Sequence, residues 1–410
     1  MGYDLVVRDA VLPDGQRADI AVDDGDVAAI DADADADTEL DADGGLVAAG
    51  FLDCHVHLDK AYIASDLPVN ETGTLAEAIA NIHDRKREYT VADVRERAER
   101  AIAAHVRNGC TRLRTHVDVD TIGDLTPLRG VLAARENWAD VVDVQIVAFP
   151  QEGIRRDPGT ADLLADAMAA GADVVGGMPD NERTDADTRA HIDTILDLAA
   201  EFDAPVDAHV DETDDPSARS LEYLAAETLD RGFEDVTAGH TCALAAYDDP
   251  HAARVVDLAA EAGLKFVTNP TTNLLLQGRH DGHPKRRGLT RVDDLRDAGL
   301  TVAAGQDCIR DGFYPYGRAS MQETAFLTAH AAHFQTRAER RAVWRMITDA
   351  AADVMGLDYG LSAGLPATLN VFPPTVDSPT AALREGRAPR YVLHEGEVVA
   401  ETEVRSEIVA

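Results

Sequence analysis

The sequence predicts a (β/α)8 barrel of the TIM type that carries a small β-sandwich module built from both chain ends. Two observations support this fold class, and a third argues against the alternative. Eight short apolar segments alternate with helical patterns in the middle of the chain, as βα repeats do. Both ends of the chain consist of short strand-like segments. The alternative is a doubly wound open sheet, which the eight repeats and the missing GxGxxG sequence after the first strand disfavour.

The chain ends justify the β module. Residues 3–12 ("YDLVVRDAVL") and 18–30 ("ADIAVDDGDVAAI") alternate apolar and polar residues between Gly and Asp turns. Residues 390–400 ("RYVLHEGEVVA") alternate in the same way, with a hairpin turn at Glu395–Gly396. The acidic stretch 31–45 is interpreted as a solvated loop. We therefore expect residues 1–49 and 365–410 to pack as one module, and residues 50–364 to form the barrel.

The barrel strands are expected at the eight apolar segments. These are residues 50–57, 110–119, 142–152, 172–179, 205–212, 236–241, 265–270 and 301–308. Patterns such as "DVRERAERAIAAHVRNG" (93–109) and "ADTRAHIDTILDLAAEFD" (186–203) place apolar residues at helical spacing between them.

The charge of the chain excludes two classes of partner. Its 410 residues include 75 acidic and 38 basic residues, a formal net charge of −37. Such a surface repels the phosphates of nucleic acids and anionic lipids, so we expect neither nucleic acid nor a membrane as partner. No apolar run approaches the roughly 20 residues that span a bilayer, and the first residues lack a signal-peptide pattern. We expect a cytoplasmic protein.

Two further features of the composition concern the protein's environment. The acidic residues are dispersed, and lysine is scarce relative to arginine. Both features are typical of proteins from cells with high internal salt, where screening weakens self-repulsion, so a halophilic origin is a hypothesis. The four cysteines, Cys54, Cys110, Cys242 and Cys308, form no CxxC pair, and a disulfide framework is implausible at this length.

Polar side chains stand at the ends of the predicted strands, where packing alone would favour apolar residues. Barrels of this type carry their chemistry at the C-terminal ends of the strands. In chain order the polar residues are His55, His57, His116, Asp118, Gln151, Glu152, His209, Glu212, His240, Asn269 and Asp307. The histidines of the helical stretches are interpreted as structural: His83, His105, His191, His251, His330 and His333.

Four of the strand-end residues suit a metal ion. His55 and His57 are two residues apart on a strand, so their side chains point to the same side. With His209 and Asp307 they offer three imidazole nitrogens and one carboxylate oxygen, a set that binds borderline divalent ions. An open position would remain for a water molecule, whose pKa the metal would lower. His55 and His57 alone are a weak signal, but the matching residues on three further strands favour a metal site.

Longer motifs resemble the amidohydrolase superfamily, and nearly the whole barrel resembles bacterial cytosine deaminases. The matching stretches include "HVHLDKAY" (55–62), "NETGTLAEAI" (70–79), "RTHVDVD" (114–120), "DVQIVAFPQEGI" (143–154), "DAHVDETDD" (207–215), "NPTTNLLLQGR" (269–279) and "PKRRGLTRV" (284–292). The resemblance implies one Fe²⁺ or Zn²⁺ held by His55, His57, His209 and Asp307, and a homo-oligomer. The fourth strand ends in "GGMP" without a lysine, so the bridging carbamate of two-metal members is not expected.

The resemblance also assigns catalytic and substrate-binding roles. Glu212 would carry a proton to ring nitrogen N3, His240 would orient the attacking hydroxide, and Asp307 would accept the proton of the water. Gln151 would read the amide edge of a pyrimidine, because its side chain offers a donor and an acceptor. Leu75 and Phe313 would form pocket walls.

The end of the eighth strand departs from the family pattern. It reads "GQDC" (305–308), which keeps Asp307 but has Gln306, Cys308 and Phe313 where the family pattern has His, a second Asp and Trp. The second Asp would lie near C5 of the substrate, and a cysteine there is smaller and apolar. We therefore expect conversion of cytosine to uracil and ammonia, and also or preferentially of 5-methylcytosine to thymine.

Two alternatives stay open at this point. One is an aminohydrolase of another amino-substituted ring, such as a triazine, a pterin or isoguanine. The other is a catalytically silent metal-binding barrel, which the joint presence of Glu212, His240 and Asp307 disfavours, because a structural site needs no proton carrier.

Overall fold

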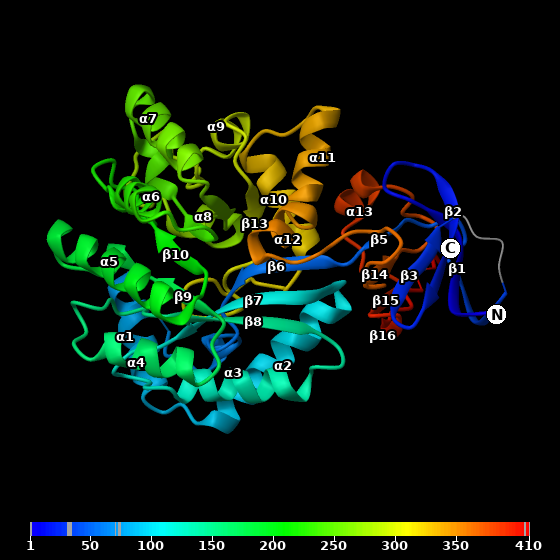
Figure 1. Cartoon of the computed structure of the whole chain (residues 1–410), viewed down its shortest axis with the longest axis horizontal. Helices are drawn as coiled ribbons and strands as arrows, with labels where there is room; N and C mark the ends of the chain where they lie inside the picture. Colours follow the sequence, from blue (N-terminus) through cyan, green and yellow to red (C-terminus); the bar gives the residue numbers. More distant parts are fainter. Residues whose placement is uncertain (1, 31–34, 70, 73–74, 406, 410) are drawn as a thin grey trace.

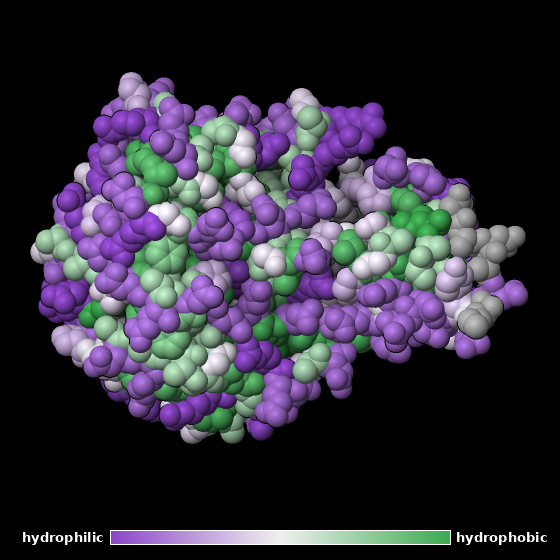
Figure 2. Space-filling model, viewed as in Figure 1, coloured by the Kyte–Doolittle hydropathy of each residue, from purple (hydrophilic) through white to green (hydrophobic). Residues whose placement is uncertain are grey.

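The computed structural model describes residues 2–30, 35–69, 71–72, 75–405 and 407–409. Within them the side chains of Leu75 and Ala76 are not described. Figure 1 shows a barrel surrounded by helices, with a smaller β region beside it that holds both chain ends. None of the helices in the described ranges is long and apolar enough to cross a membrane. The face viewed in Figure 2 is largely hydrophilic.

Eight parallel strands form the barrel in chain order. They are β6 (Phe51–Val56), β7 (Cys110–Asp118), β8 (Asp143–Phe149), β9 (Val174–Gly177), β10 (Val206–Val210), β11 (Val236–His240), β12 (Lys265–Thr268) and β13 (Val302–Ala304). Each lies within one of the eight predicted segments, so the predicted fold class is confirmed. Most of their residues are buried on both faces, as in parallel sheets that helices cover.

The first and last strands meet just beyond the end of β13. The backbone N–H of Asp307 donates to the carbonyl of His55 at 2.7 Å, and that of His57 donates to the carbonyl of Asp307 at 3.1 Å. Gly305 permits this approach, because a Cβ there would lie 2.5 Å from the Cβ of His55. The seam of the barrel therefore brings the motif of the first strand against the end of the eighth.

Helices follow the barrel strands and cover them. They are α1 (Leu75–Lys86), α2 (Val91–Arg107), α3 (Thr126–Asn137), α4 (Thr160–Ala169), α5 (Asp185–Phe202), α6 (Ser220–Arg231), α7 (Asp249–Glu261), α8 (Pro270–Leu276), α9 (Val292–Asp297), α10 (Met321–Ala331), α11 (Arg337–Arg345), α12 (Asp349–Met355) and α13 (Pro379–Glu385). Short 3₁₀ turns add η1 (Ile63–Ser65), η2 (Pro179–Asn181) and η3 (Cys242–Ala246). Threonine caps start several helices: Thr90 accepts from the Asp93 N–H ahead of α2, and Thr184 accepts from Asp187 ahead of α5.

Two of the helical histidines, His105 and His191, make buried structural contacts, as predicted. His105 on α2 is fully buried, and its Nε2 lies 3.0 Å from Oδ2 of Asp53 on β6. His191 on α5 accepts from the Met178 N–H and contacts Glu182 at 2.8 Å. The assignment of His333 to a helix was wrong, because α10 ends at Ala331 and His333 takes a left-handed backbone, with φ of 58°.

The two chain ends form two sheets that pack on a common core. One sheet has the order β3 (Asp26–Ile30), β2 (Arg17–Asp23), β1 (Tyr3–Val11) and β4 (Ala36–Asp41). The other has the order β16 (Glu397–Glu401), β15 (Tyr391–His394), β14 (Leu369–Val371) and β5 (Val47–Ala49). One buried cluster unites both sheets through Val7, Ile20, Leu369, Val371 and Leu393. The domain boundaries at residues 49/50 and 364/365 stay predictions.

Two local predictions in this module have different outcomes. The hairpin turn at Glu395–Gly396 is confirmed, and both residues have positive φ angles of 47° and 84°, as tight hairpins require. The solvated loop over residues 31–45 is wrong for Ala36–Asp41, which form β4 parallel to β1. The reason is that Leu40 pairs with Val7 and packs against the core. Residues 31–34 lie outside the described residues.

Candidate active site

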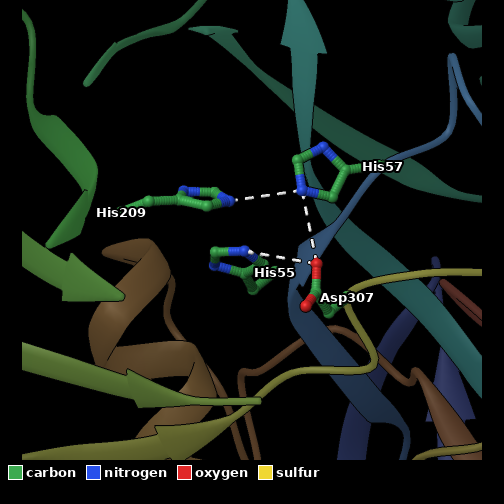
Figure 3. A group of neighbouring side chains, drawn as sticks. All are labelled: His55, His57, His209 and Asp307. Carbon is green, nitrogen blue, oxygen red and sulfur yellow. Dashed lines mark hydrogen bonds and ion pairs between the residues drawn. The ribbon is translucent and has the colours of Figure 1, made fainter. Parts of the chain in front are cut away.

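Four side chains converge at the C-terminal rim of the barrel. His55 lies on β6 and His57 directly after it, His209 lies on β10, and Asp307 follows β13. One ligand atom from each lies within 4.8 Å of the others. Oδ1 of Asp307 is 3.3 Å from Nε2 of His57 and 3.8 Å from Nε2 of His55 (Figure 3). Nε2 of His57 is 3.3 Å from Nε2 of His209. The sequence predicted this grouping, and the fold brings these residues together.

The chemistry of these atoms fits a divalent cation. All four residues are at most 3% exposed, yet both ring nitrogens of His55 and Nδ1 of His209 lack hydrogen-bond partners among the described residues. Burial lowers the pKa of His55 and His209 well below the ordinary value, and that of His57 to about 4. Neutral imidazoles are the form that binds metals. Although burial opposes it, His57 and His240 hold the pKa of Asp307 well below its usual range, so the carboxylate is ionised.

A second layer of buried polar groups supports the cluster. Nδ1 of His57 lies 3.0 Å from the carbonyl of His116, so Nε2 faces the other three residues. His116 itself contacts Asp207 at 3.2 Å, and Asp207 accepts from Arg114 at 3.0 Å. The ring of His116 lies 4.1 Å from that of His55, centroid to centroid. This predicted strand-end histidine is therefore a support beside the cluster. Outer contacts of this kind orient metal-binding imidazoles.

Glu212 and His240 form a pair next to the cluster. Oε1 of Glu212 lies 3.1 Å from Nδ1 of His240. Although burial opposes it, the Glu212 carboxylate raises the pKa of His240 to about 9. Nε2 of His240 has no partner among the residues the structure describes, and the rings of His240 and His209 are 4.5 Å apart. His240 and Asp307 both have φ of 66°. Such a backbone is uncommon for residues other than glycine and clusters at functional sites.

Asn273 joins this pair, and sequence reasoning did not identify it. Its Oδ1 lies 3.1 Å from Nδ1 of His240, and its Nδ2 donates to Oε1 of Glu212 at 3.2 Å. It lies on α8, four residues beyond Asn269, the residue that was singled out at the end of β12. The amide of Asn269 is fully buried without a hydrogen-bond partner among described residues. The spacing of one helical turn in "NPTTN" was the available signal.

The predicted substrate residues have different surroundings. Gln151 is half-buried after β8, and its Oε1 accepts from Nζ of Lys60 at 2.7 Å. Phe313 is half-buried and packs on the main core. Cys308 is 3% exposed, with its Sγ 3.7 Å from Oδ1 of Asp307. The side chain of Leu75 at the start of α1 lies outside the described part.

The end of the eighth strand has two further buried polar residues. Gln306 accepts from the Ser320 N–H at 3.2 Å, and its own N–H donates to Asp53, so it holds the strand end to the barrel. Asp311 is 2% exposed, and its Oδ1 accepts from the N–H groups of Phe313 and Tyr314. Burial raises the pKa of Asp311 to about 6. Sequence reasoning did not single out Asp311.

Comparison with known proteins settles the family. A profile of the amidohydrolase family matches residues 70–400. The chain belongs to the amidohydrolase family. It is 34% identical over 392 residues to a pterin deaminase of Rhizobium rhizogenes, which covers 93% of this chain and 88% of that protein. It is 28% identical over 418 residues to N-isopropylammelide isopropyl amidohydrolase of Pseudomonas sp. strain ADP, which covers 98% of each.

A solved structure that is similar to this chain also supports its assignment to the amidohydrolases. The 5-methylcytosine deaminase from Klebsiella pneumoniae, liganded with 5-fluorocytosine, matches with a TM-score of 0.93 and 35% identity, covering 98% of this chain and 99% of that one. The resemblance to cytosine deaminases within the amidohydrolases is therefore confirmed. The chain is a hydrolase of C–N bonds, and family members bind a divalent metal, for which this chain has a fitting group of side chains.

Proposed function

We propose that this amidohydrolase deaminates a free cytosine-type base, converting cytosine to uracil and ammonia and 5-methylcytosine to thymine and ammonia. The observation that supports it most is the cluster of His55, His57, His209 and Asp307 beside the Glu212–His240 pair, in a chain 35% identical over 98% of its length to a 5-methylcytosine deaminase. Deamination of such a ring needs an activated water and a proton carrier. In this proposal the four-residue cluster would hold the ion that activates the water, and the Glu212–His240 pair would carry the proton.

The proposed cofactor is one divalent ion, Fe²⁺ or Zn²⁺. His55, His57, His209 and Asp307 would hold it, since their buried donor atoms fit such an ion. When bound, the ion supplies Lewis-acid activation of a water molecule near neutral pH.

The proton steps are proposed for the chain's own residues. In the net reaction a C4–O bond forms from water, the C4–N bond breaks, and the amine leaves as ammonia. The Glu212 side chain is 14% exposed, so its carboxylate can face a bound ring and carry a proton to N3. His240, protonated and with Nε2 unengaged among the described residues, would donate a hydrogen bond to the attacking oxygen. Asp307 would accept the proton of the water.

Substrate contacts are proposed for Gln151, Leu75, Phe313 and Cys308. Gln151 would hydrogen-bond the lactam edge of the ring, opposite the reacting amine. Leu75 and Phe313 would form apolar walls. Cys308 would lie against C5, where its thiol stays neutral, because burial and the neighbouring Asp307 raise its pKa well above the ordinary value.

Cys308 gives a prediction about the C5 substituent. A methyl group gains about 0.8 kcal/mol from apolar burial, whereas a carboxylate at this position would be desolvated by it. We expect the wild type to have a kcat/KM for 5-methylcytosine that is at least about one hundredth of that for cytosine, a limit of roughly 2.7 kcal/mol. Cys308→Asp should lower the ratio of the two kcat/KM values at least about tenfold, roughly 1.4 kcal/mol.

Ammonia release from both bases measures this ratio, with bound metal quantified in each sample. Cys110→Ser serves as the control, because Cys110 is buried at the opposite, N-terminal end of β7. The C5 assignment is wrong if Cys308→Asp binds metal and leaves the ratio unchanged.

Asn273 gives a prediction about the proton-carrying pair. We expect Asn273→Ala to lower kcat for cytosine about 10- to 100-fold, the usual cost of losing a group that orients a catalytic one. KM and metal content should stay near the wild-type values, because Asn273 contacts Glu212 and His240 and none of the four proposed ligands. Asn137→Ala on the surface of α3 is the control. Unchanged kcat would contradict a positioning role.

A second candidate function follows from the relatives. The pterin deaminase is 34% identical over most of its length, and another relative is an N-isopropylammelide isopropyl amidohydrolase. Pterin and N-isopropylammelide therefore belong in the same ammonia- or amine-release assay. Turnover of either one without turnover of cytosine or 5-methylcytosine would replace the proposed substrate class.

A further inference from the structure

A buried lysine lies behind the glutamine that is proposed to read the substrate. Lys60 is 1% exposed and lies three residues after His57 in the sequence. Its Nζ donates to Oε1 of Gln151 at 2.7 Å and to Oδ1 of Asp118 at 2.9 Å. Sequence reasoning gave Lys60 no role, and the proposed mechanism does not use it. A buried ammonium is costly unless several acceptors satisfy it.

Buried carboxylates hold this ammonium in its charged form. Although burial opposes it, Asp118 and Asp59 raise the pKa of Lys60 above its ordinary value. The second oxygen of Asp118 contacts Nζ of Lys86 on α1 at 2.5 Å, and Lys86 also donates to Asp120 at 2.6 Å. Lys60 and Lys86 therefore each contact one oxygen of the Asp118 carboxylate. The position of Nζ of Lys60 is fixed, and a protonated lysine can only donate hydrogen bonds.

The donor character of Lys60 decides which way the Gln151 amide faces. A glutamine amide has two orientations that exchange its oxygen and nitrogen, and only the hydrogen-bond network distinguishes them. Because Lys60 has no acceptor, Oε1 must face it. The side-chain hydrogen bond of Gln151 to a described residue is then made through Oε1, which leaves its NH₂ group available to a ligand. The main chain of Gln151 is held as well, since its carbonyl accepts from Nδ2 of Asn181 and its N–H donates to Phe149.

We propose that Lys60 is a positioning residue that fixes the Gln151 amide with its NH₂ group toward the substrate. The site then selects rings that present a carbonyl oxygen to Gln151 and rejects rings that carry an amino group at that place. The second lone pair of Oε1 can accept the adjacent ring N–H, so the amide matches a lactam edge. This inference rests on the proposed function, in which Gln151 meets the ring opposite the reacting amine.

The pair of cytosine and 2,4-diaminopyrimidine tests the inference. These rings share the 4-amino group and differ at C2, which carries a carbonyl in one and an amine in the other. The ratio of their kcat/KM values is measured by ammonia release with the metal-loaded enzyme. We expect the wild type to prefer cytosine at least about 100-fold, because a buried donor facing an amine is left unpaired. In Lys60→Met the Gln151 amide is free to rotate and exchange the positions of its oxygen and nitrogen. The ratio of kcat/KM for cytosine to that for 2,4-diaminopyrimidine should therefore fall at least about tenfold, mainly through changes in KM, with metal content unchanged.

Two further variants make the test sharp. Gln151→Glu keeps an oxygen for Lys60 and replaces the NH₂ donor with an acceptor, so the preference should move toward 2,4-diaminopyrimidine. It leaves Asp118 paired and therefore remains informative if Lys60→Met does not fold. Lys265→Met is the control and should keep the wild-type ratio. Lys265 is the first residue of β12, at the end of the barrel opposite the site, and its Nζ donates to Asp235.

The outcomes separate this inference from the proposed function. If the wild type deaminates cytosine, and both Lys60→Met and Gln151→Glu keep a cytosine-to-diaminopyrimidine ratio within twofold of the wild-type ratio, the inference is wrong and the proposed function stands. A wild type that releases ammonia from neither cytosine nor 5-methylcytosine overturns the proposed function and the inference with it. A lowered ratio in Lys60→Met, or a reversed one in Gln151→Glu, supports the inference.

Discussion

Glu212→Gln is expected to lower kcat for cytosine by about 10²- to 10⁴-fold, the range that a positioned proton carrier contributes. The substitution keeps the shape of the side chain and an oxygen that can accept from Nδ1 of His240 and Nδ2 of Asn273. It removes the ability to carry a proton to N3. Because the ion is proposed to be held by His55, His57, His209 and Asp307 and not by Glu212, metal content should stay at the wild-type value.

The measurement is kcat by ammonia release, together with metal content of the purified variant. Glu222→Gln is a matched control on α6, where the carboxylate pairs with Arg254 on the surface, and it should keep wild-type activity. A Glu212→Gln enzyme with metal bound and kcat within tenfold of wild type would contradict the proposed role. This result also separates the enzyme from a silent metal-binding barrel, in which the substitution would change nothing measurable.

His209→Ala is expected to abolish both metal binding and turnover. The substitution removes one of three neutral imidazoles from a cluster that is at most 3% exposed, so fewer donors remain for the ion. A metal that binds only the folded state stabilises it, by about 4 kcal/mol when its free concentration is 1,000 times Kd. Chelation should therefore lower the melting temperature of the wild type, and adding Zn²⁺ or Fe²⁺ back should restore it. The variant should respond to neither treatment.

Metal content and thermal unfolding, with and without chelator, check this prediction. His330→Ala is the control, because His330 lies on the exposed side of α10, where its ring contacts the carbonyl and the ring of Phe326. It should bind metal as the wild type does. Stoichiometric metal in His209→Ala, or a wild-type melting temperature that is indifferent to chelation, would contradict a metal site at this cluster.

The periodicity of the sequence was enough to predict the barrel and the meeting of its strand ends. A period of two puts His55 and His57 on one side, and parallel strands end at one rim, so His209 and Asp307 had to lie near them. The closing contacts of Asp307 with His55 and His57 follow from the same geometry. These predictions depend on where each strand ends and on the order of the strands. Both can be inferred from a local βα pattern that the sequence repeats eight times.

Contacts made by loops and short helices could not be predicted in this way. Asn273 reaches Glu212 from α8, and Lys60 reaches Gln151 across 91 positions of the chain. Neither contact follows from a period, because the path of the segment after a strand decides it. β4 was missed because its Asp and Glu residues mask the alternation that lets Leu40 pack on the module core.

The measurement that tests the central proposal most directly is ammonia release from cytosine and 5-methylcytosine by enzyme loaded with Fe²⁺ or Zn²⁺, in low salt and in molar KCl. We predict turnover of both bases, with kcat/KM for 5-methylcytosine at least about one hundredth of that for cytosine. If neither base reacts with metal bound, while pterin or N-isopropylammelide does, deamination of a cytosine-type base is the wrong function.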